Sequence, residues 1–120
     1  MGDITKNFSL HEFPCPCCGR NDVTARLVVG LQRLRDILQV PITVTSGFRC
    51  RKYNTLIKGA AESQHMSGRA ADVVVPGLTE DEVGDAGEQV PVFRDGGIGV
   101  YPCRHVHLDV RIGRVRWRTV

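Results

Sequence analysis

The sequence lacks long hydrophobic runs, because its longest apolar stretches, Leu27–Val29 and Val73–Val75, contain three residues each. A helix that spans a bilayer needs about 20 consecutive apolar residues, so we expect no membrane span. The first residues also lack the basic segment and the apolar stretch of a secretory signal. We therefore expect the protein to be made in the cytoplasm.

Aromatic residues and net charge are also scarce, which argues against nucleic-acid binding. Aromatic residues make up 6% of the chain, and 16 basic against 13 acidic residues give a net charge of +3. Two Tyr and one Trp offer few surfaces on which bases could stack, so no nucleic-acid partner is expected. The basic residues near the C-terminus indicate a charged strand edge or, alternatively, a surface for an anionic polymer: Arg104, Arg111, Arg114, Arg116 and Arg118.

The rest of the composition is that of a globular protein. Hydrophobic residues make up 42% and charged residues 24% of the 120 residues, which is enough for one hydrophobic core. We expect a single domain over residues 1–120, acting as a monomer. Residues 1–21 are rich in Cys, Pro and Gly and are expected to form an irregular segment packed on that domain.

Apolar periodicity and turn residues predict alternating helices and strands. Helices are expected from a cap at Asp22 or Thr24 to Pro41, over residues 51–58, and over residues 80–89 after a Thr79–Glu82 capping box. Strands are expected over residues 42–45, 70–75, 98–101, 105–111 and 114–119, the last two joined as a hairpin. These last strands lie too close in sequence for crossover connections. We therefore predict an α+β fold, with a mostly antiparallel sheet and helices packed on one face.

Histidine and aspartate residues form the first candidate site. His105, His107 and Asp109 alternate along one expected strand, so their side chains share a face of the sheet. Asp72 precedes the apolar run at residues 73–75, and a buried carboxylate needs a partner or a metal. His65, Asp72 and His107 would make a three-ligand zinc site with one position open for water. In the competing interpretation, His65 caps a turn and Asp72 pairs with an arginine.

The turn Ser46-Gly47-Phe48-Arg49 follows the first expected strand and forms the second candidate site. Such a turn can direct an arginine into a cleft, where its guanidinium binds a carboxylate through two parallel hydrogen bonds. We expect Arg49 to face a substrate rather than a structural carboxylate. The alternative is a surface arginine on a tight turn.

Five cysteines form the third candidate site, and their odd number prevents complete pairing within the chain. Cys15-x-x-Cys18-Gly resembles half of a zinc knuckle, whose other half would come from Cys50, Cys103 or His11. Three alternatives stay open: a second, structural zinc ion at Cys15 and Cys18, a disulfide for which Cys50 is the natural partner, or free thiols.

Several motifs together carry a family resemblance over about residues 7–117. They are Phe8-Ser9-Leu10-x-Glu12-Phe13, Ser46-Gly47-Phe48-Arg49, Ser63-x-His65-x-x-Gly68-x-Ala70-x-Asp72, Gly97-Ile98-Gly99-Val100-Tyr101-Pro102 and His107-Leu108-Asp109-Val110. This set resembles the zinc D-alanyl-D-alanine carboxypeptidase family, which shares its fold with the Hedgehog signalling domain. The branch it resembles is that of short phage and prophage peptidases, some of which are endolysins.

The resemblance implies a role for each matched residue. The ligands of one catalytic zinc ion would be His65, Asp72 and His107. Arg49 matches an arginine that holds a substrate carboxylate or carbonyl oxygen, and His105 matches a histidine that helps to stabilise the tetrahedral intermediate. Further substrate contacts are expected from Ser63 and Tyr101.

One departure concerns the general base. Many family members have an acidic residue three positions before the last zinc ligand, where this chain has Arg104. An arginine cannot accept a proton from water at neutral pH. We expect Asp109 to act as the base instead. The alternatives are another acid such as Asp95, or an Asp109 that only orients a ligand histidine.

The resemblance implies a zinc peptidase that hydrolyses peptidoglycan stem or cross-bridge peptides, as a carboxypeptidase or an endopeptidase. Such a protein would act at the bacterial cell wall or in the periplasm after release from the cytoplasm, in the manner of phage enzymes. The alternative is a non-catalytic cell-wall or protein-binding module that retains the zinc site.

Overall fold

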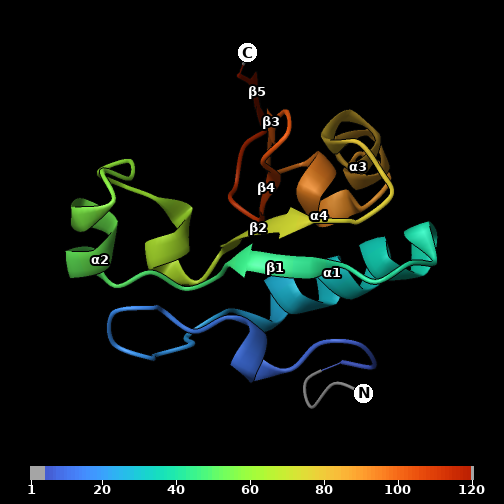
Figure 1. Cartoon of the computed structure of the whole chain (residues 1–120). Helices are drawn as coiled ribbons and strands as arrows, with labels where there is room; N and C mark the ends of the chain where they lie inside the picture. Colours follow the sequence, from blue (N-terminus) through green and yellow to red (C-terminus); the bar gives the residue numbers. More distant parts are fainter. Residues whose placement is uncertain (1–4, 120) are drawn as a thin grey trace.

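A five-stranded sheet forms the centre of the computed structural model, which describes residues 5–119 (Figure 1). Its strands in chain order are β1 (Thr43–Ser46), β2 (Ala70–Val74), β3 (Gly97–Tyr101), β4 (His105–Asp109) and β5 (Val115–Arg118). Their order across the sheet is β1-β2-β4-β3-β5, and all neighbours are antiparallel except the parallel pair β3 and β5. The expected α+β fold with a mostly antiparallel sheet is therefore confirmed.

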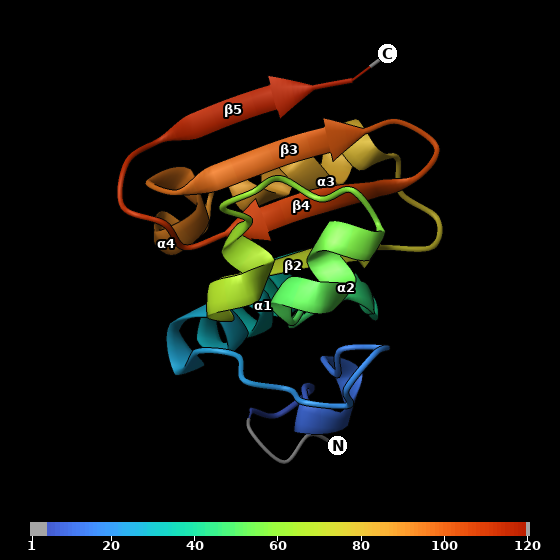
Figure 2. The ribbon, with the colours of Figure 1, turned by 90° about the vertical axis from the view of Figure 1, so that its left-hand side faces the viewer.

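The expected hairpin between the last two strands is wrong, because both edges of β4 are already occupied. His107 lies opposite Asp72 of β2 on one side and opposite Gly99 of β3 on the other. The chain therefore passes the start of β3, and β5 pairs in parallel with β3 at the outer edge of the sheet (Figure 2). Trp117 comes to lie opposite Gly99, where a side chain on residue 99 would collide with the indole.

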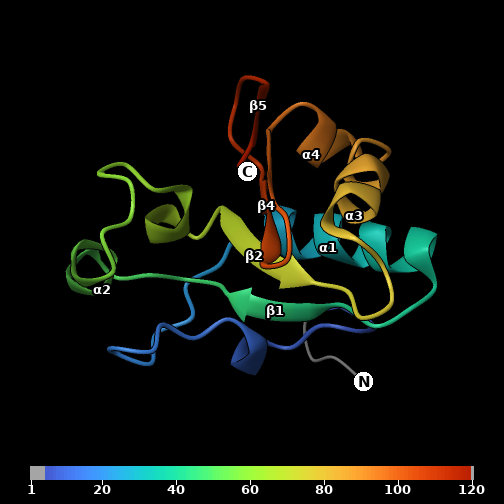
Figure 3. The ribbon, with the colours of Figure 1, turned by 45° about the horizontal axis from the view of Figure 1, so that its top comes forward.

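Three helices cover one face of the sheet (Figure 3). They are α1 (Ala25–Leu38), α3 (Glu80–Gly87) and α4 (Pro91–Arg94). The Thr24 hydroxyl accepts the N–H of Leu27 and starts α1, whose apolar side packs into a continuous core with the sheet and α4. This core contains Leu27, Leu31, Leu34, Phe93 and Leu108, each fully buried. Burial of each such side chain contributes about 1.5–3 kcal/mol to the hydrophobic term.

Two short helical segments lie outside this layer. The short helix α2 (Arg51–Leu56) and the 3₁₀ helix η2 (Gln64–Ser67) lie over the opposite face (Figures 2 and 3). Their segment is mostly polar, so it covers the sheet without adding to the main core. Gly68 ends η2 at φ 70°, where a Cβ would collide with the carbonyl oxygen of Asp22. A helix over residues 51–58 was expected from the sequence, whereas η2 was not.

The N-terminal segment is anchored to the turn that follows β1. It contains a short 3₁₀ helix, η1 (Leu10–Glu12), and its two phenylalanines, Phe8 and Phe13, are buried in the core. The carbonyl oxygen of Phe13 accepts the N–H of Phe48 at 2.9 Å. The segment is therefore held to the turn that carries Arg49.

Basic residues near the C-terminus form ion pairs with acidic residues in and after α3. Arg116 and Arg118 of β5 bond to Glu88 and Asp81 of the α3 region, at 2.7 and 3.0 Å. This pairing favours the interpretation of the basic C-terminal segment as a charged strand edge. Within residues 5–119, no helix is both long and apolar enough to cross a membrane.

Candidate metal centre

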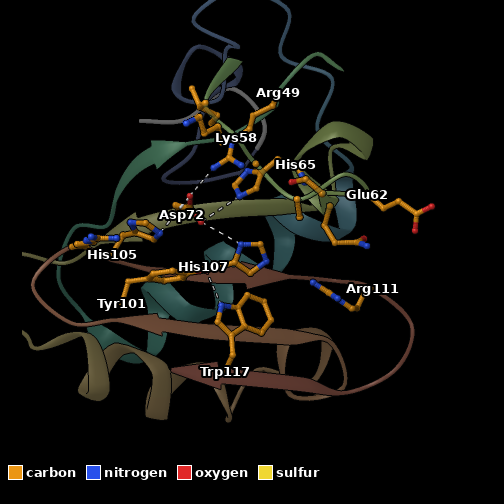
Figure 4. A pocket seen from close by; sticks show the side chains of 16 residues that line it. Arg49, Lys58, Glu62, His65, Asp72, Tyr101, His105, His107, Arg111 and Trp117 are labelled. Carbon is orange, nitrogen blue, oxygen red and sulfur yellow. Dashed lines mark hydrogen bonds and ion pairs between the residues drawn. The ribbon is translucent and has the colours of Figure 1, made fainter. Parts of the chain in front are cut away.

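Three side chains from separate elements converge on the face opposite the main helical layer (Figure 4). They are His65 of η2, Asp72 of β2 and His107 of β4, and their ligand atoms lie within 4.8 Å of one another. Asp72 Oδ1 is 3.3 Å from His65 Nε2 and 3.3 Å from His107 Nδ1. Ligands about 2.0–2.1 Å from a tetrahedral zinc ion would lie about 3.3 Å apart, so the observed spacing fits that ion.

The tautomer of each histidine follows from its second ring nitrogen. His65 Nδ1 lies 2.8 Å from the carbonyl oxygen of Gly47, which can only accept, so Nδ1 carries the proton. His107 Nε2 lies 2.7 Å from Asp109 Oδ2 and donates its proton to that carboxylate. Each ring therefore directs an unprotonated nitrogen at Asp72, which is the arrangement that metal-binding histidines need.

This arrangement needs a positive charge at its centre. Two nitrogen lone pairs face a carboxylate oxygen, and His65 Nε2 and Asp72 Oδ1 are buried without a hydrogen-bond partner among the described residues. Burial opposes the charged form of Asp72, but hydrogen bonds from His107 and His65 in their protonated form outweigh it and hold its pKa well below the usual range, whereas a bound cation would leave both rings neutral. A carboxylate kept ionised between two neutral imidazoles is a donor set that fits zinc.

Arg49 lies differently from our expectation, because its guanidinium pairs with the other oxygen of Asp72. Arg49 Nη2 donates to Asp72 Oδ2 at 3.1 Å, and Nε donates to the Ser46 hydroxyl at 3.2 Å. The paired strands β1 and β2 bring the turn and Asp72 together, so the nearest anion is this carboxylate. Arg49 also lines the cavity in front of the site, so it remains within reach of a substrate.

Asp109 is placed behind His107 and not at the cavity. It is fully buried. Its carboxylate oxygens accept hydrogen bonds from Nε2–H of His107, the backbone N–H of Gly97 and the guanidinium of Arg111. Burial raises the pKa of Asp109, but these bonds outweigh it and hold the pKa well below the usual range. This placement favours the role of orienting His107 over the expected role of general base.

His105 and Tyr101 lie together beside the three candidate ligands. Their rings stack with centroids 4.5 Å apart, and His105 Nε2 is 3.6 Å from Asp72 Oδ2. Burial lowers the pKa of His105 despite the nearby carboxylate, which favours the neutral ring. The Tyr101 hydroxyl accepts the indole N–H of Trp117 at 2.8 Å, so β5 supports this part of the site.

A cavity of about 510 Å³ opens in front of the site. Every expected site residue except Asp109 lines it, as does Arg104. Ser63 also caps η2, since its hydroxyl accepts the N–H of His65 at 3.2 Å. Other lining residues were not expected from the sequence, among them Lys58, Glu62, Arg111 and Trp117. Gly99 was a possible signal for Trp117, because a glycine inside a strand often marks the close approach of another group, and the indole of Trp117 packs against Gly99.

The comparisons with known proteins bear on what this site does. A family model described as Peptidase M15 matches residues 6–109 and so covers all the candidate ligands. The search of curated proteins finds no match. Since the matched region is most of the chain and contains a donor set that fits zinc, this protein belongs to the Peptidase M15 family of zinc-dependent metallopeptidases.

Proposed function

We propose that this protein hydrolyses peptide bonds in bacterial peptidoglycan, on stem or cross-bridge peptides. The observation that carries the proposal is the pair of histidines whose free nitrogens face Asp72 at an open cavity. Family membership supports the reaction class, and the resemblance to short phage peptidases supports the substrate. The site of action would be the cell wall, reached after release from the cytoplasm.

A zinc ion held by His65, Asp72 and His107 would supply an activated water and polarise the peptide carbonyl. The chain's own contribution is to keep the three donors in position. The Gly47 carbonyl and the Asp109 carboxylate each hold one imidazole by its second nitrogen. Arg49 holds the second oxygen of Asp72. These contacts prepare the donors before any substrate binds.

The charges around the cavity fit an anionic peptide. Arg104 and Lys58 line it, and neither side chain forms an ion pair with a residue in the described range 5–119. Peptidoglycan stem peptides carry free carboxylates, which arginine binds through paired hydrogen bonds. A terminal carboxylate would make the protein a carboxypeptidase, and a side-chain carboxylate within a cross-bridge would make it an endopeptidase.

We assign the proton transfer to His105. Asp109 is occupied by its own hydrogen bonds, and the carboxylate of Glu62 points away from Asp72 (Figure 4). His105 lies beside Asp72 at the cavity with its ring in the neutral form, so Nε2 can accept a proton and pass it to the leaving amine.

The alternative function is a non-catalytic module that binds cell-wall peptides. Two observations favour it: Arg104 stands where a base is expected, and among residues 5–119 only Glu62 adds a carboxylate to the cavity lining besides Asp72. The module would still bind an anionic peptide through the same cationic side chains.

Digestion of purified peptidoglycan with mass analysis of the products tests the proposal. The zinc-loaded protein should release single amino acids if it is a carboxypeptidase, or larger fragments if it is an endopeptidase. A chelator and the variant His107→Ala should both abolish release, whereas His11→Ala, at an exposed histidine outside the site, should not. A fully zinc-loaded protein that binds peptidoglycan but digests none from any source would establish the binding module.

A further inference from the structure

A second group of potential ligands lies away from the histidine site, at the junction of the N-terminal segment and the turn after β1. The sulfur atoms of Cys15, Cys18 and Cys50 lie within 4.8 Å of one another, and those of Cys15 and Cys50 are 3.6 Å apart. Sulfurs about 2.3 Å from a tetrahedral zinc ion would lie about 3.8 Å apart, so this spacing fits zinc. His11 and Cys103 are not part of the group.

We propose that Cys15, Cys18 and Cys50 bind a second zinc ion, which is structural and holds the N-terminal segment to the turn that carries Arg49. Zinc prefers thiolate ligands at such sites, and cysteines from two separate segments are typical of zinc knuckles. This proposal does not depend on the peptidase function, because the ion would have no part in the reaction.

Hydrogen bonds to the sulfurs support thiolate ligands. Cys15 accepts the backbone N–H of Cys50 at 3.4 Å, and Cys50 accepts that of Tyr53 at 3.4 Å. Metal ligation requires the deprotonated form, so these N–H groups favour binding.

A disulfide accounts for less of the geometry. A bond between Cys15 and Cys50 would use two sulfurs and leave Cys18 beside them without a function, although Cys18 belongs to the same group. The observed separation of 3.6 Å is also close to the ligand spacing of a zinc site and well beyond a covalent sulfur–sulfur bond of about 2.05 Å.

The location of the three cysteines suggests what the proposed ion would stabilise. Cys50 directly follows Arg49 and is the N-cap of α2. The same turn provides the Gly47 carbonyl that fixes the tautomer of His65, and the backbone N–H of Arg49 donates to the carbonyl of His65 at 3.2 Å. An ion at the cysteines would therefore hold in place the turn on which the histidine site depends.

Zinc analysis of protein purified under reducing conditions tests the proposal. The wild type should contain about two zinc ions per chain, and Cys18→Ser and His107→Ala should each lose about one. Cys18 is exposed, so its replacement leaves the core intact, and Cys103→Ser, also at an exposed cysteine, is the matched control that should keep both ions. In cobalt-substituted protein, the sulfur charge-transfer absorption should disappear in Cys18→Ser and persist in His107→Ala.

Two results would overturn the proposal. One is a Cys18→Ser variant with the zinc content and cobalt spectrum of the wild type. The other is a Cys15–Cys50 disulfide found by peptide mapping of protein isolated without reductant. If Cys18→Ser does not fold, a thiol-specific mercurial added to the wild type serves instead. It should release about one zinc ion while the histidine site keeps its own, and release of none would refute the cysteine site.

Discussion

Asp109 accepts the Nε2–H of His107 at 2.7 Å, and this bond determines that Nδ1 of the same ring faces Asp72. Asp109 is itself fixed by the N–H of Gly97 and by Arg111, so it cannot turn toward the cavity. The carboxylate thus acts on the metal centre through the orientation of a ligand, at the far side of the imidazole.

The first prediction concerns the substitution Asp109→Asn. The loss of the charge behind His107 should weaken zinc binding about 10- to 100-fold, as for other groups that orient a metal ligand. Turnover at saturating zinc should largely persist, because the base lies elsewhere. Zinc titration with a competing chelator measures the affinity, and Asp85→Asn, on the exposed side of α3, is the control. Tight zinc binding combined with abolished turnover would instead return the base role to Asp109.

The second prediction concerns Arg49. The substitution Arg49→Lys keeps one positive charge but loses the fork that reaches Asp72 and Ser46 at once. We expect kcat/KM to fall by the equivalent of about 1.5–3 kcal/mol, the range for a hydrogen bond to a charged group. Arg51→Lys, at an exposed position two residues later, should leave kcat/KM unchanged. Equal kcat/KM values for both variants would remove Arg49 from the site.

Local sequence patterns were sufficient to predict the shared face of the polar residues on β4 and the burial of Asp72, whereas the grouping of these residues with His65 stayed one of two interpretations. The two-residue spacing of His105, His107 and Asp109 fixes their common face in any extended strand. The apolar run after Asp72 implies its burial, and the structure does bury it. These inferences need only the conformation of one short segment at a time, which the sequence determines well.

Features that depend on distant segments were not predictable in the same way. The partner of β5 depends on which strand edges remain free after the other strands have paired. The residues of β5 alone do not indicate which edge that is. The tautomer of His65 depends on the carbonyl of Gly47, 18 positions away. The role of Asp109 also stayed open, because the hydrogen bonds that occupy its oxygens come partly from Gly97, 12 positions earlier.

The third prediction concerns stability at acidic pH. Hydrogen bonds from Arg116, with help from Arg114, lower the pKa of Glu88 in the folded protein to about 2, from an ordinary value of 4.5. The stabilising contribution of this carboxylate is therefore complete above about pH 4.5 and disappears as the pH falls toward 2.

Glu88→Gln should reduce this dependence. We expect a loss of about 0.5–1 kcal/mol at neutral pH, because the pair is partly exposed, and a flatter stability curve below pH 4.5. Denaturant titrations at several pH values measure both effects. Glu62→Gln, at a carboxylate without an ion pair in the described range 5–119, should keep the wild-type curve, and the idea fails if the two variants behave alike.

The last prediction concerns the proton transfer assigned to His105. Glutamine at this position keeps a polar side chain beside Asp72 but cannot accept a proton and return it. His105→Gln should therefore lower kcat about 100- to 10,000-fold, with the zinc content and KM close to those of the wild type. The comparison variant is Glu62→Gln, because within the described part of the chain Glu62 and Asp72 are the carboxylates that line the cavity. Its side chain points away from Asp72 (Figure 4), so kcat should change little.

The reverse result, with kcat lost in Glu62→Gln and retained in His105→Gln, would mean that the loop bearing Glu62 closes over the substrate and supplies the base.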